Sequence, residues 1–392
     1  VFTGGLLTIV LGSAVLLLAC PLLSYSSSLK EYAVLICAYT LASNLHSLCA
    51  QYVRAEGKTG LFALQGILNT ALVIFFNILF LLFFKLGVLG YVMSVVAADG
   101  LCTLYLVLHE KLWTVCTPDP EKPLWKSMLR YSIPLIPTTI FWWITSVSDR
   151  YMIAYFLGTE ANGLYAVACK IPTVLTLLST IFLEAWQFSA IEEATGDREV
   201  HIRFYGQVWS AFLSAMVMAG SVLIVLCRVE IRLLSAARYF EAWKYVPVLS
   251  IAMVFSAFAS FMGSVYVVTE KSRLSFRTTL WGALANILLN LLLIPRIGIQ
   301  GAAIATLASY VLCFSIRAVS ARKLIPFPLR FTRLVFSAAL LGIQSLLCFV
   351  NSPIQPIGQI VALLLLLMAN RKPFVQTVQQ LLHVVSSRTQ KK

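Results

Sequence analysis

Charged side chains inside long apolar stretches are the residues of this sequence that could do chemistry. Asp99, Asp149, Arg150, Lys170 and Glu184 all lie within such stretches of the 392-residue chain. A charge at the centre of a membrane-spanning helix costs at least about 2.5–3.5 kcal/mol, so it is retained where it has a partner or a function. The pattern predicts a cationic, titratable site, with Asp99 as either a neutral hydrogen-bonded acid or a carrier of a proton or cation.

Two apolar segments, 129–156 and 163–189, predict an antiparallel hairpin around the turn 158–163. Asp149 is 11.5 residues from the turn centre and Lys170 is 9.5 residues from it. At 1.5 Å per residue, their depths differ by about 3 Å. We therefore expect Asp149 to reach Lys170, either as a buried pair that locks the two helices or as part of a polar lumen.

Prolines and indoles add further candidates to the first of these segments. Pro134 and Pro137 remove helix donors, which predicts either a static kink or a hinge. Trp142 and Trp143 follow at mid-helix, where they either pack between helices or line a cavity and stack on a sugar or lipid.

Other polar residues in the second half of the chain have simpler interpretations. Asn286 and Asn290 are four residues apart, so they share one helix face and predict interhelical hydrogen bonds. Arg317 lies near a helix end, where we expect it to snorkel towards water. Glu184 lies near the inner end of its segment, either as a solvated vestibule group or as a relay.

The composition excludes most soluble functions. Hydrophobic residues make up 59% of the chain and charged residues 12%, against about 45–50% and about 25% in soluble proteins. The net charge of +14 comes from cations spread thinly among apolar runs, which favours basic membrane loops over a nucleic-acid partner. No metal or cofactor is predicted, because the nine cysteines form no C-x-x-C pair, the four histidines are scattered and no phosphate-binding G-x-x-x-x-G-K loop occurs.

Twelve long apolar segments predict an all-α, polytopic membrane bundle of about twelve transmembrane helices. They span residues 2–23, 32–53, 61–84, 88–109, 129–156, 163–189, 204–227, 245–268, 276–295, 299–321, 332–350 and 356–370. Loops assigned alternately to two sides carry 20 and 7 Lys and Arg residues, and three more cations lie within segments. Because the basic side of a membrane protein faces the cytoplasm, we expect a cytoplasmic C-terminus.

An internal repeat predicts two related bundles. The turn 85–90 resembles the turn 296–301, 211 residues later, and 55–58 resembles 269–272 with nearly the same offset. By that offset the first bundle lacks two helices, and we expect a parent of about fourteen helices. The expected parts are the remainder of an N-terminal bundle at 1–110, a cytoplasmic linker at 111–128, a six-helix bundle at 129–323, two extra helices at 324–370 and a basic cytoplasmic tail at 371–392.

An ordered set of motifs resembles a known family. Arg130–Pro137 is followed by Ser148–Tyr151, Asn162–Tyr165, Lys170–Pro172 and Glu184–Gln187. This set resembles the Wzx-type polysaccharide-biosynthesis flippases of the MATE-like exporter superfamily. The resemblance implies two pseudo-repeated bundles around a cationic lumen. It also implies transfer of an undecaprenyl-diphosphate-linked oligosaccharide across the bacterial inner membrane by alternating access, for O-antigen, capsule or exopolysaccharide synthesis.

The resemblance also implies that Arg150 and Lys170 would meet the diphosphate or anionic sugars, with Asp149 in their network. The residues themselves make Trp142 and Trp143 further candidates for substrate binding and Pro134 and Pro137 candidates for a hinge. Asp149, Asp99 and Glu184 are the candidates for ion or proton coupling. The expected partners are the lipid-linked substrate, membrane lipids and other glycan-assembly proteins. A cation-coupled drug exporter of the same fold is the alternative; a membrane-embedded glycan polymerase is disfavoured because the outer loops are short. We therefore do not expect an enzyme.

Overall fold

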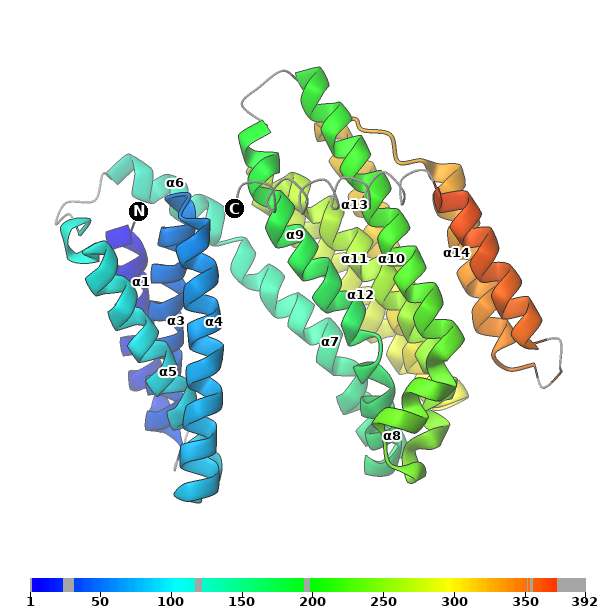
Figure 1. Cartoon of the computed structure of the whole chain (residues 1–392), viewed down its shortest axis with the longest axis horizontal. Helices are drawn as coiled ribbons and strands as arrows, with labels where there is room; N and C mark the ends of the chain where they lie inside the picture. Colours follow the sequence, from blue (N-terminus) through cyan, green and yellow to red (C-terminus); the bar gives the residue numbers. More distant parts are fainter. Residues whose placement is uncertain are drawn as a thin grey trace, which may run out of the picture. The chain divides into compact units, whose positions relative to one another are not determined.

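The computed structural model describes residues 2–23, 32–116, 122–193, 198–350, 352 and 355–371, and all regular structure in these residues is helical. The helices are α1 (Phe2–Leu23), α3 (Ala33–Ala55), α4 (Thr59–Asn77), η1 (Ile78–Phe83), α5 (Gly87–Glu110), η2 (Leu112–Thr114), α6 (Lys122–Ser132), α7 (Leu135–Leu157), α8 (Thr159–Lys170), α9 (Thr173–Glu193), α10 (Arg198–Leu234), η3 (Ala237–Lys244), α11 (Val246–Val268), α12 (Ser272–Ile297), α13 (Ile299–Leu324), α14 (Phe331–Leu347) and Gln355–Arg371. Figure 1 labels those named α and leaves η1, η2, η3 and Gln355–Arg371 without a label. The predicted tail lies outside the described residues apart from Arg371, as do linker residues 117–121.

Each predicted apolar segment overlaps one or two of these helices. Within the described residues, eight helices are long and apolar enough to cross a membrane, and nine if the bent pair of α8 and α9 counts as one span. Two shorter apolar helices, α14 and Gln355–Arg371, follow. The all-α membrane fold predicted from the sequence is confirmed.

The chain divides into two compact units, residues 1–129 and 130–392. In the first unit, α3 packs against α1, α4 and α5 around a small core that includes Phe2, Val53 and Leu106. Most of the remaining apolar side chains are exposed. In the most hydrophobic 18-residue stretch of the span Thr59–Phe83, no residue is buried within the protein. Such a surface is stable when lipid chains cover it.

In the second unit, α11 is the central helix and packs against α9, α10 and α13. In the most hydrophobic 18-residue stretch of α11, 67% of the residues are buried. Aromatic rings of α10 pack against rings of α11. The ring centroid of Trp209 lies 5.2 Å from those of both Phe258 and Phe261, and that of Phe212 lies 5.4 Å from that of Phe261. These edge-on, tilted and stacked pairs fill the space between helices and fix their spacing.

The two turns of the predicted repeat have the same backbone design. Gly87 and Gly298 both adopt positive φ, at 57° and 64°, where a side chain would be strained. Three residues after each of these glycines, a second glycine, Gly90 or Gly301, packs against the helical segment that precedes the turn. A Cβ on Gly90 would lie 3.1 Å from the Phe80 carbonyl oxygen, and one on Gly301 would lie 2.5 Å from that of Leu293. Both turns therefore bring two helices into close backbone contact.

Two spans are interrupted at prolines. The predicted segment 129–156 is two helices, because α6 ends at Ser132 and α7 begins at Leu135 after Pro134. The segment 163–189 is also broken, at residues 171–172, where α8 and α9 meet at 41°. Pro172 has no N–H to continue the α-helical hydrogen bonds. Backbone N–H groups three residues on take over instead: Val174 donates to the Ile171 carbonyl and Leu175 to the Pro172 carbonyl.

Candidate functional site

Asp149 is the centre of a buried polar network in the second unit. Only 3% of the residue is exposed. Tyr165 of α8 and Thr306 of α13 donate hydroxyl hydrogen bonds to Oδ2, at 2.8 and 2.5 Å, and Asn290 of α12 donates to Oδ1 at 2.5 Å. One carboxylate therefore accepts bonds from three helices in addition to its own.

Asn286 extends this network. It accepts hydrogen bonds from Asn290 at 3.1 Å and from Ser148 at 2.8 Å. The interhelical role predicted for Asn286 and Asn290 is confirmed. Among the described residues, the side chains that donate to Asp149 are all neutral.

The expected pair between Asp149 and Lys170 is not formed. Lys170 is exposed and makes no ion pair with any described carboxylate, whereas Asp149 faces α12 and α13. The comparison of depths was insufficient, because position along two helices does not fix the direction in which each side chain points. Lys170 is the last residue of α8, so its charge lies at the negative end of that helix dipole, beside the break.

Arg150 and Lys170 lie on adjacent helices of the second unit. Arg150 is exposed on α7, next to the buried Asp149, and Lys170 is exposed at the end of α8, which packs against α7. Both cations therefore lie on accessible surface near the broken helix, where each can attract an anionic group.

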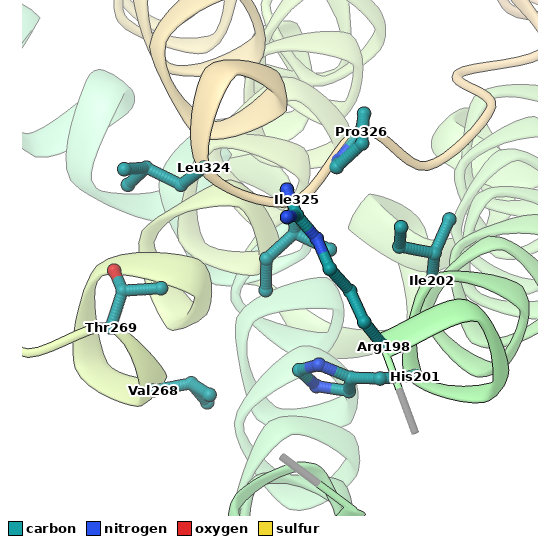
Figure 2. Close-up of a pocket in the computed structure, with 8 residues that line it drawn as sticks. All are labelled: Arg198, His201, Ile202, Val268, Thr269, Leu324, Ile325 and Pro326. Atoms are coloured by element: carbon teal, nitrogen blue, oxygen red, sulfur yellow. The ribbon is translucent and has the colours of Figure 1, made fainter. Parts of the chain in front are cut away.

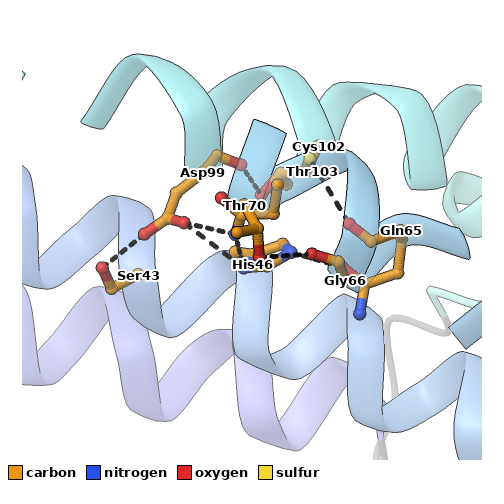
Figure 3. Close-up of polar contacts among 9 residues, drawn as sticks. Ser43, His46, Gln65, Gly66, Thr70, Asp99, Cys102 and Thr103 are labelled. Carbon is orange, nitrogen blue, oxygen red and sulfur yellow. Dashed lines mark hydrogen bonds and ion pairs between the residues drawn. The ribbon is translucent and has the colours of Figure 1, made fainter. Parts of the chain in front are cut away.

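Asp99 lies in a separate polar cluster of the first unit, with 5% of its surface exposed. As Figure 3 shows, Ser43 of α3 donates to Oδ2 at 2.5 Å. Asn69 of α4 donates to Oδ1 at 2.9 Å, and His46 Nδ1 lies 3.4 Å from the same oxygen. Nε2 of His46 is 2.7 Å from Gln65 Oε1, so three helices meet at one carboxylate and one imidazole.

The hydrogen bonds of the His46 ring favour one tautomer. Asn69 Nδ2 lies 3.1 Å from Nδ1 and can only donate, while Gln65 Oε1 can only accept. The neutral ring therefore carries its proton on Nε2. The Nδ1 lone pair then accepts from Asn69 Nδ2, and Asp99 Oδ1 lies on the same side of the ring, 3.4 Å from Nδ1.

The remaining predicted residues are placed as follows. Trp142 is partly buried, with its ring 5.9 Å from Tyr310 and 5.4 Å from the Arg317 guanidinium. Trp143 is 59% exposed. Glu184 is exposed on α9. Pro134 precedes the first residue of α7, and Pro137 lies in its first turn, where a missing N–H breaks no helical bond.

The expectation that Arg317 snorkels is wrong. Arg317 is 3% exposed and donates to Thr278 at 3.0 Å, to Thr279 at 2.8 Å and to the Ala259 carbonyl at 2.8 Å. A Cβ at Gly263 would lie 2.6 Å from its Nη1, so a glycine leaves the space that the guanidinium fills. Bonds to neutral acceptors on two neighbouring helices thus replace hydration.

Comparison with known proteins agrees with this architecture. Residues 1–187 match the polysaccharide biosynthesis protein family. The resemblance drawn from the motifs is thereby confirmed for this part of the chain. An uncharacterized membrane protein of Methanocaldococcus jannaschii is 23% identical over 256 residues, or 61% of this chain. The match spans 59% of that protein's length, less than two thirds.

Solved structures show the same fold. A mutant of the Vibrio cholerae MATE transporter VcmN has a TM-score of 0.69 at 17% identity, with 82% of this chain and 76% of that chain covered. The lipid II flippase MurJ, in an inward closed conformation, has a TM-score of 0.63 at 16% identity, with 96% and 84% covered. This chain is therefore a multi-pass membrane protein with the helical fold shared by these transporters.

Proposed function

We propose that this protein is a flippase that moves an undecaprenyl-diphosphate-linked oligosaccharide across the bacterial inner membrane by alternating access. Its product would supply O-antigen, capsule or exopolysaccharide synthesis, and its C-terminus would lie in the cytoplasm. The match of residues 1–187 to polysaccharide biosynthesis proteins and the transporter fold support this class of function.

The observation that carries the proposal is a pair of exposed cations beside a broken membrane helix. Arg150 lies eight residues before Gly158 and Lys170 lies twelve residues after it, about 12 and 18 Å along their helices. The hydrocarbon core is about 30 Å thick, so both positions are near its centre. Exposed cations and a broken helix are tolerated there when they line an aqueous path. A diphosphate is the matching ligand, because it presents several negative charges to both cations.

The other predicted contacts fit the same path. Trp143 is exposed on α7, the helix that also carries Arg150, and would stack on a sugar or lipid. Pro134 and Pro137 lie just after the boundary between the two units at residues 129 and 130, where a hinge would let one unit move against the other. Glu184 is exposed on α9 and would act in the vestibule.

Coupling to a proton gradient would act through the buried acids. A protonated Asp149 would carry an O–H on Oδ1, the oxygen that accepts a single hydrogen bond, from Asn290 of α12. Proton uptake would therefore alter the hydrogen bonding between α7 and α12. In the first unit, Asp99 would be the proton or cation carrier, with His46 Nδ1 3.4 Å from its Oδ1.

The test is surface glycan in the producing cell. Arg150→Gln and Lys170→Gln, separately and together, should reduce surface glycan while the protein level stays normal. Lipid-linked oligosaccharide should accumulate on the cytoplasmic face. The matched control is Arg273→Gln, an exposed cation on the first turn of α12. Unchanged glycan in the double variant, at a normal protein level, would reject the cation site.

A drug exporter of the same fold is the second candidate, because another solved structure with this fold, at a TM-score of 0.70, is a multidrug resistance MATE family transporter. The two functions differ in the cell lacking the gene. Loss of surface glycan with unchanged drug tolerance supports the flippase, whereas the opposite result supports the exporter. Other glycan-assembly proteins as partners would be sought by crosslinking in the same cells.

A further inference from the structure

A small pocket at one end of the second unit is separate from the proposed transport site. It has a volume of about 250 Å³ and lies where the N-terminus of α10 meets the C-terminal ends of α11 and α13. Figure 2 shows the Arg198 side chain extending across it to Ile325, with His201 below and Thr269 opposite. Ile202, Val268 and Leu324 supply apolar walls. Pockets for drug-sized ligands occupy about 300–1,000 Å³, so this one suits a headgroup-sized fragment.

The charge around the pocket favours an anion. The described charged residues within two positions of its lining are five cations and two acids, Arg198, Arg203, Lys271, Arg322 and Lys323 with Glu199 and Glu270. The positive end of the α10 dipole adds to this field. Arg317 lies seven residues before Leu324 on α13, about 10 Å along the helix, and forms no ion pair with a described carboxylate.

We propose that this pocket binds the phosphate of an anionic membrane lipid. Arg198 would hold the phosphate oxygens, His201 would donate from the pocket floor, and Ile202 and Val268 would contact the first carbons of the lipid. His201 is 9% exposed and stacks edge-on against Tyr205, with ring centroids 5.0 Å apart, so its position is fixed. The pocket lies at the ends of membrane-crossing helices, the level at which lipid phosphates occur. This site does not depend on the proposed transport substrate.

The test is lipid binding by the purified protein in detergent, measured by native mass spectrometry with dioleoyl phosphatidylglycerol and dioleoyl phosphatidylcholine. We expect tighter binding of phosphatidylglycerol. Arg198→Gln should weaken that binding about tenfold, as expected for loss of a charge-assisted contact. Ile202→Trp, which fills the pocket without changing its charge, should weaken it similarly. Arg203→Gln is the matched control, on the same helix but outside the lining, and should change binding by about twofold or less.

Three results would overturn the proposal. Equal binding of both lipids would show that the pocket does not recognise the net negative charge of phosphatidylglycerol. Equal losses in the Arg198 and Arg203 variants would show general surface attraction. Displacement of the lipid by glycerol 3-phosphate at the same concentration would assign the pocket to a soluble phosphate. Melting temperatures of the variants close to wild type would confirm that each one is folded.

Discussion

Removing the carboxylate of Asp149 should weaken the packing of the second unit. The perturbation is Asp149→Leu, which has similar bulk and accepts no hydrogen bond. Three donors on α8, α12 and α13 lose their acceptor at once, namely Tyr165, Asn290 and Thr306. Tyr165 and Asn290 are fully or almost fully buried, at 2% and 0% exposure, so water cannot replace the lost acceptor.

The magnitude follows from these contacts. Interhelical hydrogen bonds in membrane proteins average about 0.6 kcal/mol, which gives about 2 kcal/mol for three. A donor left buried without an acceptor costs about 1–3 kcal/mol, although Thr306 can rotate its hydroxyl to a helix carbonyl. The expected loss in the free energy of unfolding is therefore about 2–4 kcal/mol. At about 2–4 °C per kcal/mol, the melting temperature should fall by roughly 5–15 °C.

The assay is thermal unfolding of the purified protein in detergent, followed by tryptophan fluorescence. Thr306→Val removes one of the three bonds and should cause a smaller fall than Asp149→Leu, because Tyr165 and Asn290 still donate to the carboxylate. Ser148→Ala, which removes only the bond to Asn286, should cause a small fall. A wild-type melting temperature for Asp149→Leu would refute the reasoning, because it would mean that the network does not hold the helices together.

Three further predictions concern other parts of the chain. Gly301→Ala places a Cβ 2.5 Å from the Leu293 carbonyl oxygen and should lower the free energy of unfolding by about 1–3 kcal/mol in the same thermal assay. The control is Gly342→Ala, whose Cβ meets no atom within 4 Å and should leave stability unchanged. Equal melting temperatures of the two variants would contradict the turn geometry. Arg317→Leu loses three hydrogen bonds and should lower the free energy of unfolding by about 1–3 kcal/mol; an unchanged melting temperature would show that the guanidinium is not held. Asp99→Asn and Asp149→Asn together should abolish the response of translocation to an imposed pH gradient in proteoliposomes; a retained response would place proton binding elsewhere.

The helices could be predicted from the sequence because their signal is local. Runs of apolar residues long enough to cross a bilayer define α3, α5 and α11 almost to the residue. The break between α8 and α9 was missed because the sequence stays apolar through Ile171 and Pro172, so hydropathy alone does not mark it. Its signal was the proline itself, which cannot continue a helical ladder.

The polar sites could be predicted only in part, because partners come from distant helices. Asn286 and Asn290 share one helix, so their common face was visible in the sequence. The pairing of Asp149 with Lys170 failed because depth does not give rotation about the helix axis. The partners of Asp99 were missed, although a signal existed: His46 is nine residues from the end of α3, Asn69 ten from the start of α4 and Asp99 eleven from the end of α5. Equal depth from one side of the membrane places all three at one level.

The most direct test of the central claim is translocation by the purified protein in proteoliposomes. Undecaprenyl-diphosphate-linked oligosaccharide would be placed in both leaflets, and its movement followed by the loss of protection from an added glycosidase. We predict that the wild-type protein makes the inner-leaflet substrate accessible within minutes. The Arg150→Gln and Lys170→Gln double variant should leave it protected, and Arg273→Gln should behave as wild type. Equal translocation by the double variant and the wild type would contradict the account.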